Sequence, residues 1–189
     1  MYSSNLPTQF EKEPDLLKLA THKIDKGLKY FPNDEHCIRL KCRIHKILSA
    51  NDIDGFSKLL LNWYNCSTIP NAWLLYELGR AYFILGYYDY SKKYFKELES
   101  GVGIGNTNRM RPKNPYCDIN GETIEFEGTV IKIFSIYEGL IRCDALRNLK
   151  YPIMFRPIAS NYNVLEGDQI VFNIAFNFLG ARAENVKKH

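Results

Sequence analysis

The sequence lacks the patterns that mark several common classes of protein. Its four histidines lie apart, and its five cysteines include no Cys-x-x-Cys pair, so the spacing favours neither a zinc site nor a disulfide framework. No apolar run approaches the roughly 20 residues that a membrane-spanning helix needs. The first fifteen residues have neither the apolar core nor the basic start of a signal peptide. We therefore expect free thiols, no metal or other cofactor, and a cytoplasmic location.

Catalytic motifs are missing as well. The sequence contains no Gly-x-Ser-x-Gly and no His-Glu-x-x-His. The glycine-rich run at 101–105 lacks the Lys-Ser/Thr of a phosphate loop and follows a helical pattern rather than a strand. The acidic pairs Asp118/Glu122 and Asp52/Asp54 lie among turn residues, where solvated side chains are common. We therefore expect a protein that is not an enzyme.

What the sequence does have is a mild positive charge and many aromatic residues. The net charge of +4 permits an anionic partner without requiring one. With 13 tyrosines and 11 phenylalanines, the chain has enough rings both for cores and for half-exposed binding surfaces. Composition alone leaves both uses open.

Hydrophobic periodicity divides the chain into two halves. Up to residue 99 apolar residues return every three or four positions, which predicts helices. Residues 100–121 form a connector rich in glycine, proline and basic residues. From residue 122 to 189 short alternating runs predict five strands, enough for a small closed barrel. The expected fold class is α+β, with α-helical hairpin repeats followed by a five-stranded OB-type β-barrel.

The helical half resembles the tetratricopeptide repeat (TPR) family. The segment that shows the resemblance is Leu78-Gly79-x-x-Tyr82-x-x-x-Gly86-x-Tyr88-x-x-Ser91-x-x-x-Phe95-x-x-Leu98. Positions that correspond to Ser91 recur at Ala20 and Phe56. The spacings of 36 and 35 residues from Ala20 to Phe56 to Ser91 compare with about 34 in the family. One repeat is strong, one is degenerate and one is a half.

The strong repeat assigns a mechanical role to each of its key residues. Gly79 allows close approach of two helices, Tyr82 and Phe95 fill the space between them, Gly86 makes the turn, and Ser91 lies where the helices cross. About three repeats are usually needed for stability. Because the chain has about two and a half, we expect the connector and barrel to cover the end of the stack.

The TPR resemblance also implies a concave groove that binds a protein or peptide partner. Aromatic and basic side chains on its wall would suit an acidic or aromatic peptide end. The alternative is that Trp73 and Phe83 only pack on the preceding helices. The residues assigned to the groove are Lys41, His45, Trp73, Tyr76, Arg80 and Phe83.

The second half resembles a cold-shock domain over residues 126–188. The resemblance lies in the order of five short motifs, of which three are Gly128-Thr129-Val130, Tyr137-Glu138-Gly139-Leu140-Ile141 and Ile153-Met154-Phe155-Arg156. The other two are Leu165-Glu166-Gly167-Asp168-Gln169-Ile170-Val171-Phe172 and Gly180-Ala181-Arg182-Ala183-Glu184-Asn185-Val186. This order implies an OB-type barrel.

Cold-shock domains stack bases on aromatic side chains beside basic residues, so the resemblance implies binding of single-stranded RNA or DNA. Leu140, Met154 and Ile133 depart from that pattern because they are not aromatic, so binding would depend more on charge. Arg147, Lys150 and Arg182 are further sources of charge. The residues assigned to nucleic-acid binding are Lys132, Phe134, Tyr137, Arg142, Phe155 and Arg156 in the barrel, with Arg109 and Arg111 in the connector.

Together these patterns predict a non-catalytic adaptor. Its barrel would bind single-stranded nucleic acid, RNA in the first instance, and its repeats would bind a protein. The alternative is a protein–protein scaffold subunit in which the barrel has lost its nucleic-acid face. A third possibility is that the chain is part of a longer protein.

Overall fold

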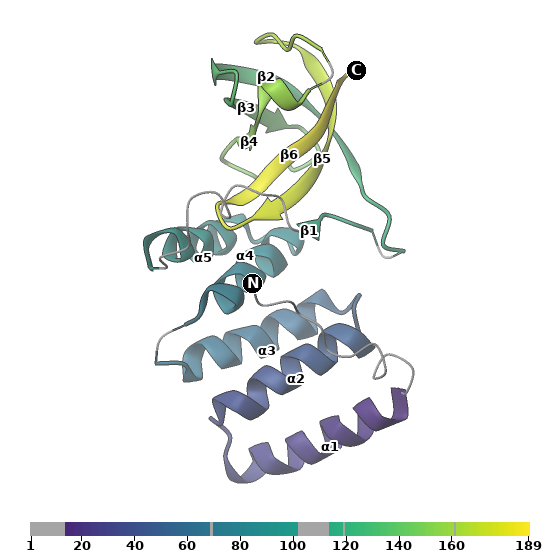
Figure 1. Cartoon of the computed structure of the whole chain (residues 1–189), viewed down its shortest axis with the longest axis vertical. Helices are drawn as coiled ribbons and strands as arrows, with labels where there is room; N and C mark the ends of the chain where they lie inside the picture. The colour runs from purple at the N-terminus through teal and green to yellow at the C-terminus, as the bar shows by residue number, and fades with distance from the viewer. Residues whose placement is uncertain (1–13, 69, 102–113, 119, 161) are drawn as a thin grey trace. The chain divides into compact units, whose positions relative to one another are not determined.

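The computed structural model of the chain describes residues 14–68, 70–101, 114–118, 120–160 and 162–189 (Figure 1). Within these residues five helices come first and a closed five-stranded β-barrel with one extra strand follows. This arrangement confirms the predicted α+β fold class. The chain forms two compact units, one ending at Leu74 and the other beginning at Leu75.

The first unit is built from three helices and the start of a fourth. These are α1 (Pro14–Tyr30), α2 (Glu35–Leu48), α3 (Ile53–Cys66) and the first residues of α4 (Ala72–Ile84). Carboxylates cap two of them: Asp34 accepts from the Cys37 amide and Asp52 accepts from the Gly55 amide. Such caps satisfy amide groups that the first helical turn leaves without partners.

A buried stripe on these helices forms the core of the first unit. Ile38, Cys42, Leu60 and Trp63 are almost completely buried, as expected for amphipathic helices that pack side by side. The Trp63 indole Nε1 donates to Glu35 Oε1 at 2.9 Å. The ring is therefore packed and its polar atom satisfied.

Helices α4 and α5 (Tyr88–Gly101) form a tight hairpin. A Cβ atom at Gly79 would lie 2.8 Å from Phe95 Cε2, so the close approach requires glycine. Ser91 Oγ donates to the Gly79 carbonyl at 2.7 Å, and Gly86 has a φ of +80° at the turn. The roles predicted for Gly79, Gly86 and Ser91 are confirmed.

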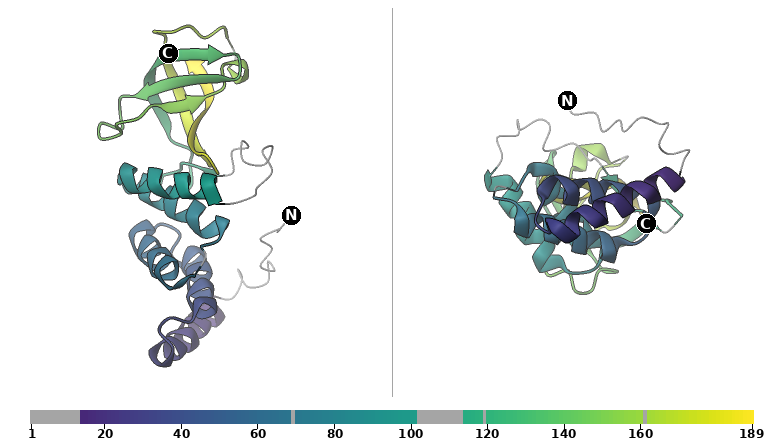
Figure 2. Two further views of the ribbon diagram at one scale, coloured as in Figure 1. Left: turned by 90° about the vertical axis from the view of Figure 1, so that its left-hand side faces the viewer. Right: turned by 90° about the horizontal axis from the view of Figure 1, so that it is seen from below.

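The barrel strands follow the OB order. They are β1 (Asn114–Pro115), β2 (Glu125–Ser135), β3 (Glu138–Cys143), β4 (Ile153–Phe155), β5 (Gln169–Asn177) and β6 (Gly180–Lys188), with a short 3-10 helix η2 (Pro157–Ala159) after β4. The sheet runs β5-β2-β3-β4-β6 and closes through β6–β5, with β4 and β6 parallel and β1 added outside β5 (Figure 2). Inward-facing residues fill its interior, among them Val130, Ile141, Ile153, Phe155, Ile170, Phe172, Ile174 and Val186.

Within the second unit the α4–α5 hairpin packs on the end of the barrel that carries the β5–β6 turn. The ring centroids of Phe83 and Phe176 lie 5.3 Å apart, as do those of Tyr76 and Phe178, both pairs edge to face. Aromatic pairs of this kind add stability beyond their buried area. These contacts agree with the expectation that the barrel covers the end of the helical stack; most of the connector, residues 102–113, lies outside the described residues.

Candidate nucleic-acid interface

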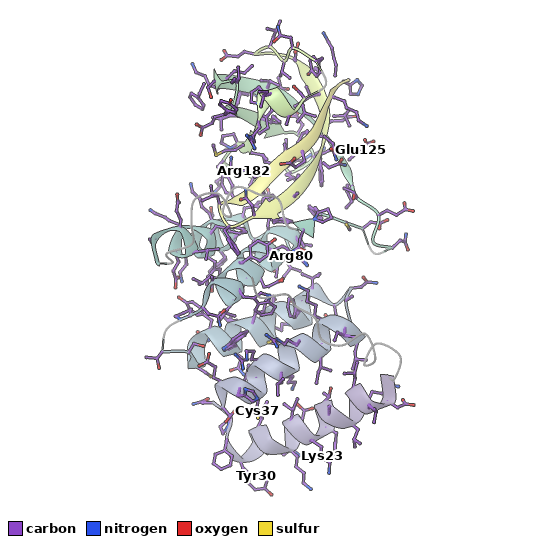
Figure 3. The ribbon with its side chains drawn as sticks, in the orientation of Figure 1. Lys23, Tyr30, Cys37, Arg80, Glu125 and Arg182 are labelled. Carbon is purple, nitrogen blue, oxygen red and sulfur yellow. The ribbon has the colours of Figure 1, made fainter. Side chains whose placement is uncertain are left out.

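A strip of outward-facing side chains crosses four strands of the barrel. Lys132 on β2 pairs with Leu140 on β3, Leu140 pairs with Met154 on β4, and Met154 pairs with Arg182 on β6 (Arg182 is marked in Figure 3). Because neighbouring strands place paired residues on one face, these four residues form a continuous row. We call them the strand strip.

A β-bulge brings Lys132 into this row. Val130 pairs with Ile141 and Lys132 pairs with Leu140, so Ile131 has no partner on β3. Val130 is buried, and strict alternation would turn a residue two positions later inward as well. The extra residue resets the alternation, and Lys132 is exposed.

Exposed rings gather at the β2–β3 turn. Phe134 and Tyr137 are 59% and 56% exposed, and the Arg156 guanidinium carbon lies 5.8 Å from the centroid of the Tyr137 ring. The Ile158 amide donates to the Ile136 carbonyl at 2.8 Å, which ties η2 to the same turn. We call Phe134, Ile136, Tyr137, Arg156 and Ile158 the turn patch.

The cations around these surfaces differ in how far they are already neutralised. Burial lowers the pKa of Arg182, while the Glu138 and Glu184 carboxylates act to raise it. Burial raises the pKa of Glu184, and Arg156 and Arg182 oppose that rise. Arg182 and Arg156 therefore both lie in the electrostatic field of the Glu184 carboxylate.

Three further cations on these surfaces are more exposed than Arg182. Arg142 Nε lies 3.2 Å from Asp144 Oδ1 on the surface, so its charge is partly compensated. Lys132 and Arg156 make no ion pair within the part of the chain that the structure describes. Lys132 and Arg156 are therefore the cations of these surfaces that are exposed and make no ion pair among the described residues, and the Glu184 carboxylate attracts Arg156 as it does Arg182.

The structure corrects one predicted contact residue in the barrel. Phe155 is 1% exposed and lies inside the barrel, so its ring cannot stack on a base. Alternation along β4 sends Ile153 and Phe155 inward and Met154 outward. Lys132, Phe134, Tyr137, Arg142 and Arg156 are all exposed. Arg109 and Arg111 lie outside the described residues.

The structure also corrects the predicted protein-binding groove. Tyr76 and Phe83 are 3% and 1% exposed and pack on barrel aromatics, so neither forms a groove wall. Arg80 Nε lies 3.5 Å from Glu77 Oε2, and both side chains are largely buried. Phe83 thus packs in a core, as in the alternative, although its ring partners include Tyr88 of the following helix and Phe176 of the barrel.

The other three residues assigned to the groove lie in the first unit. Lys41 Nζ is 2.6 Å from Asp25 Oδ1 and His45 Nε2 is 3.3 Å from Asp52 Oδ2. Trp73 is half-buried, and the Nζ atom of a neighbouring lysine lies 5.8 Å from the centroid of its ring. Lys41 and His45 thus already face carboxylates, and a lysine already lies over the Trp73 ring. These three side chains are therefore less available to a peptide than the groove prediction assumed.

Sequence reasoning missed Ile136 and Ile158 as surface residues. They are 58% and 55% exposed and lie in the turn patch. The sequence does contain one indication for Ile136. It lies in the short Phe-Ser-Ile-Tyr segment between two strands, where an apolar residue has no strand position that faces the core.

Comparison of the chain with protein-family models, curated proteins and solved structures found no match. The identification of the barrel as OB-like therefore rests on its strand order. The choice of the candidate interface rests on the geometry of its residues. None of the helices in the described ranges combines the length and apolarity that a membrane crossing requires. The described residues also contain no group of three or more His, Cys, Asp or Glu side chains arranged to hold a metal ion.

Proposed function

We propose that this protein is a non-catalytic adaptor whose barrel binds single-stranded nucleic acid, RNA in the first instance. The observation that carries the proposal is the juxtaposition of exposed rings and exposed cations on one barrel surface. Phe134 and Tyr137 offer π faces, while Lys132 and Arg156 offer charge. Single-strand binders combine these two elements, because every base can stack and every nucleotide carries a phosphate.

The likeness to cold-shock domains supports the same function. In those domains the strands that correspond to β3 and β4 carry stacking rings, and here the strand strip has Leu140 and Met154 instead. Each lost stacking platform removes roughly 1–3 kcal/mol per base. We therefore propose modest affinity that depends strongly on salt.

The adaptor role also needs a protein partner, and we assign it to the helices that resemble TPRs. Support comes from the local geometry at Gly79, Gly86 and Ser91, which matches the roles that the TPR pattern predicts for these residues. The partner would meet surfaces other than Tyr76 and Phe83, because the barrel covers both.

A double variant tests the nucleic-acid function. Fluorescence anisotropy with a labelled oligouridylate of about 12 nucleotides, within the site size of OB folds, should give a Kd below roughly 100 µM at low salt. K132A/R156A should weaken binding by about tenfold and flatten its salt dependence. The control is K96A/K188A, which removes two exposed lysines outside both surfaces. Equal affinity of the two double variants would contradict the assigned surface.

One observation favours a second candidate function, a protein-interaction module. Ile136 and Ile158 are exposed aliphatic side chains in the turn patch, and aliphatic residues provide no stacking platform for bases. Clustered exposed apolar residues often mark protein contacts. Absence of oligonucleotide binding at low salt would favour this candidate over the first.

A further inference from the structure

A second surface with rings and cations lies in the second unit, between the α4–α5 turn and the loop that joins β3 to β4. It is a pocket of about 430 Å³. Its walls are Gly86, Tyr87, Tyr88, Asp89 and Tyr90 from the hairpin, and Arg147, Asn148 and Lys150 from the loop. We call it the tyrosine pocket.

The helix turn fixes the position of the first tyrosine. The Gly86 amide donates to the Phe83 carbonyl at 3.0 Å, and the Tyr87 amide donates to the Tyr82 carbonyl at 2.8 Å. With Gly86 at positive φ, this is a Schellman motif, which ends α4 and sets the next residue in place. Tyr87 is thus held in the wall of the pocket by backbone bonds.

The two exposed rings are supported from behind. Tyr87 and Tyr90 are 56% and 58% exposed, and their ring centroids lie 6.1 and 5.5 Å from that of Tyr82. Tyr82 also stacks on Tyr94 at 5.6 Å. A ring that packs on other rings while keeping about half its surface in solvent loses little freedom when a planar ligand stacks on it.

The loop side of the pocket is basic and is tied to the hairpin. Tyr151 Oη donates to the Tyr88 carbonyl at 3.3 Å, and Lys92 Nζ lies 5.1 Å from the Tyr151 ring centroid. Arg147 and Lys150 are exposed and, within the described ranges, make no ion pair. Asp89 is the single acidic residue of the lining, so the pocket favours an anion.

We propose that the tyrosine pocket is a second contact point for the single-stranded nucleic acid that the barrel binds. A base would stack on Tyr87 or Tyr90, and the flanking phosphates would meet Arg147 and Lys150. This inference rests on the proposed function of the barrel. It is also favoured by continuity, because Lys150 lies four residues before Met154 of the strand strip, at most about 14 Å along an extended chain.

The test compares oligouridylates of about 4 and about 12 nucleotides, the lower and middle part of the OB site-size range. Wild type should gain affinity strongly with length, because the longer strand reaches both surfaces. R147E/K150E should weaken binding of the longer strand by about tenfold or more and abolish most of that gain. K96E/K188E, with the same change of charge elsewhere, should keep it.

Ring variants separate stacking from charge. Y87S/Y90S should weaken binding of the longer strand several-fold, whereas Y87F/Y90F, which keeps both rings, should bind within about twofold of wild type. Circular dichroism at the same concentrations shows whether each variant is folded.

The outcomes distinguish failure of the pocket from failure of the barrel. If K132A/R156A weakens binding while R147E/K150E and Y87S/Y90S do not, the pocket inference is overturned and the barrel function stands. If wild type binds neither strand, both are overturned. Tight binding of a tyrosine-phosphorylated peptide, with oligonucleotide affinity insensitive to the pocket variants, would also overturn the assignment to nucleic acid.

Discussion

The Tyr76 hydroxyl donates a 3.2 Å hydrogen bond to the carbonyl of Phe176, which joins helix α4 to strand β5 across 100 residues of sequence. The same hydroxyl accepts from Asn114 Nδ2 at 2.9 Å. Tyr76 is 3% exposed; its bond to Phe176 is buried and its bond to Asn114 is partly buried. The last helical hairpin and the barrel are thus joined by polar bonds as well as by packed rings.

Removing that hydroxyl should destabilise the second unit. Y76F leaves the buried Phe176 carbonyl short of one partner, and a buried unsatisfied group costs about 1–3 kcal/mol. Urea denaturation should show a loss of about that size in the free energy of unfolding. Y90F is the control, since Tyr90 is 58% exposed and should change stability little. Equal stability of Y76F and Y90F would contradict the role given to this bond.

Two glycine substitutions should act in opposite directions. G79A places a methyl group against the Phe95 ring at 2.8 Å, and overpacking of this kind costs typically about 1–3 kcal/mol. Gly27 lies within α1, and apart from its chain neighbours and the backbone of that helix no described atom lies within 4 Å of an added Cβ. G27A should therefore stabilise the chain, by up to about 1 kcal/mol. Thermal denaturation of both variants checks the pair, and a stabilising G79A would refute the close helix approach.

Alkaline pH should weaken the fold through its buried tyrosines. Burial raises the pKa of Tyr151 to about 12 from an ordinary value of 10.0, because the phenolate is poorly solvated there. The folded state then holds the proton more tightly than the unfolded state. The stabilising contribution is complete below pH 10 and is lost as pH rises toward 12. The free energy of unfolding should fall less steeply over this interval in Y151F than in wild type, while an unchanged slope would count against the raised pKa.

The sequence predicted best where a contact depends on residues close together in the chain. Gly79, Gly86 and Ser91 lie within one hairpin, and their spacing alone indicates close packing and a turn. Five strands in OB order also followed from alternation and turn residues. These features are local or depend on the order of elements, which a sequence records directly.

The errors arose where a side chain's direction depends on register or on a distant partner. Phe155 faces inward because β4 alternates from Ile153, and a shift of one residue reverses such an assignment. The composition of β2 gives no indication of the bulge at Ile131. Tyr76 and Phe83 were assigned to a groove because the repeat pattern does not contain the barrel residues that cover them.

The most direct test of the barrel's function is a nuclear magnetic resonance titration of the isotopically labelled full chain with an oligouridylate of about 12 nucleotides. Binding should shift the amide signals of Lys132, Tyr137, Leu140 and Met154, which belong to the strand strip and turn patch. The shifts should shrink in K132A/R156A and at high salt. Signals that stay in place at these four positions, at oligonucleotide concentrations well above 100 µM, would contradict the account.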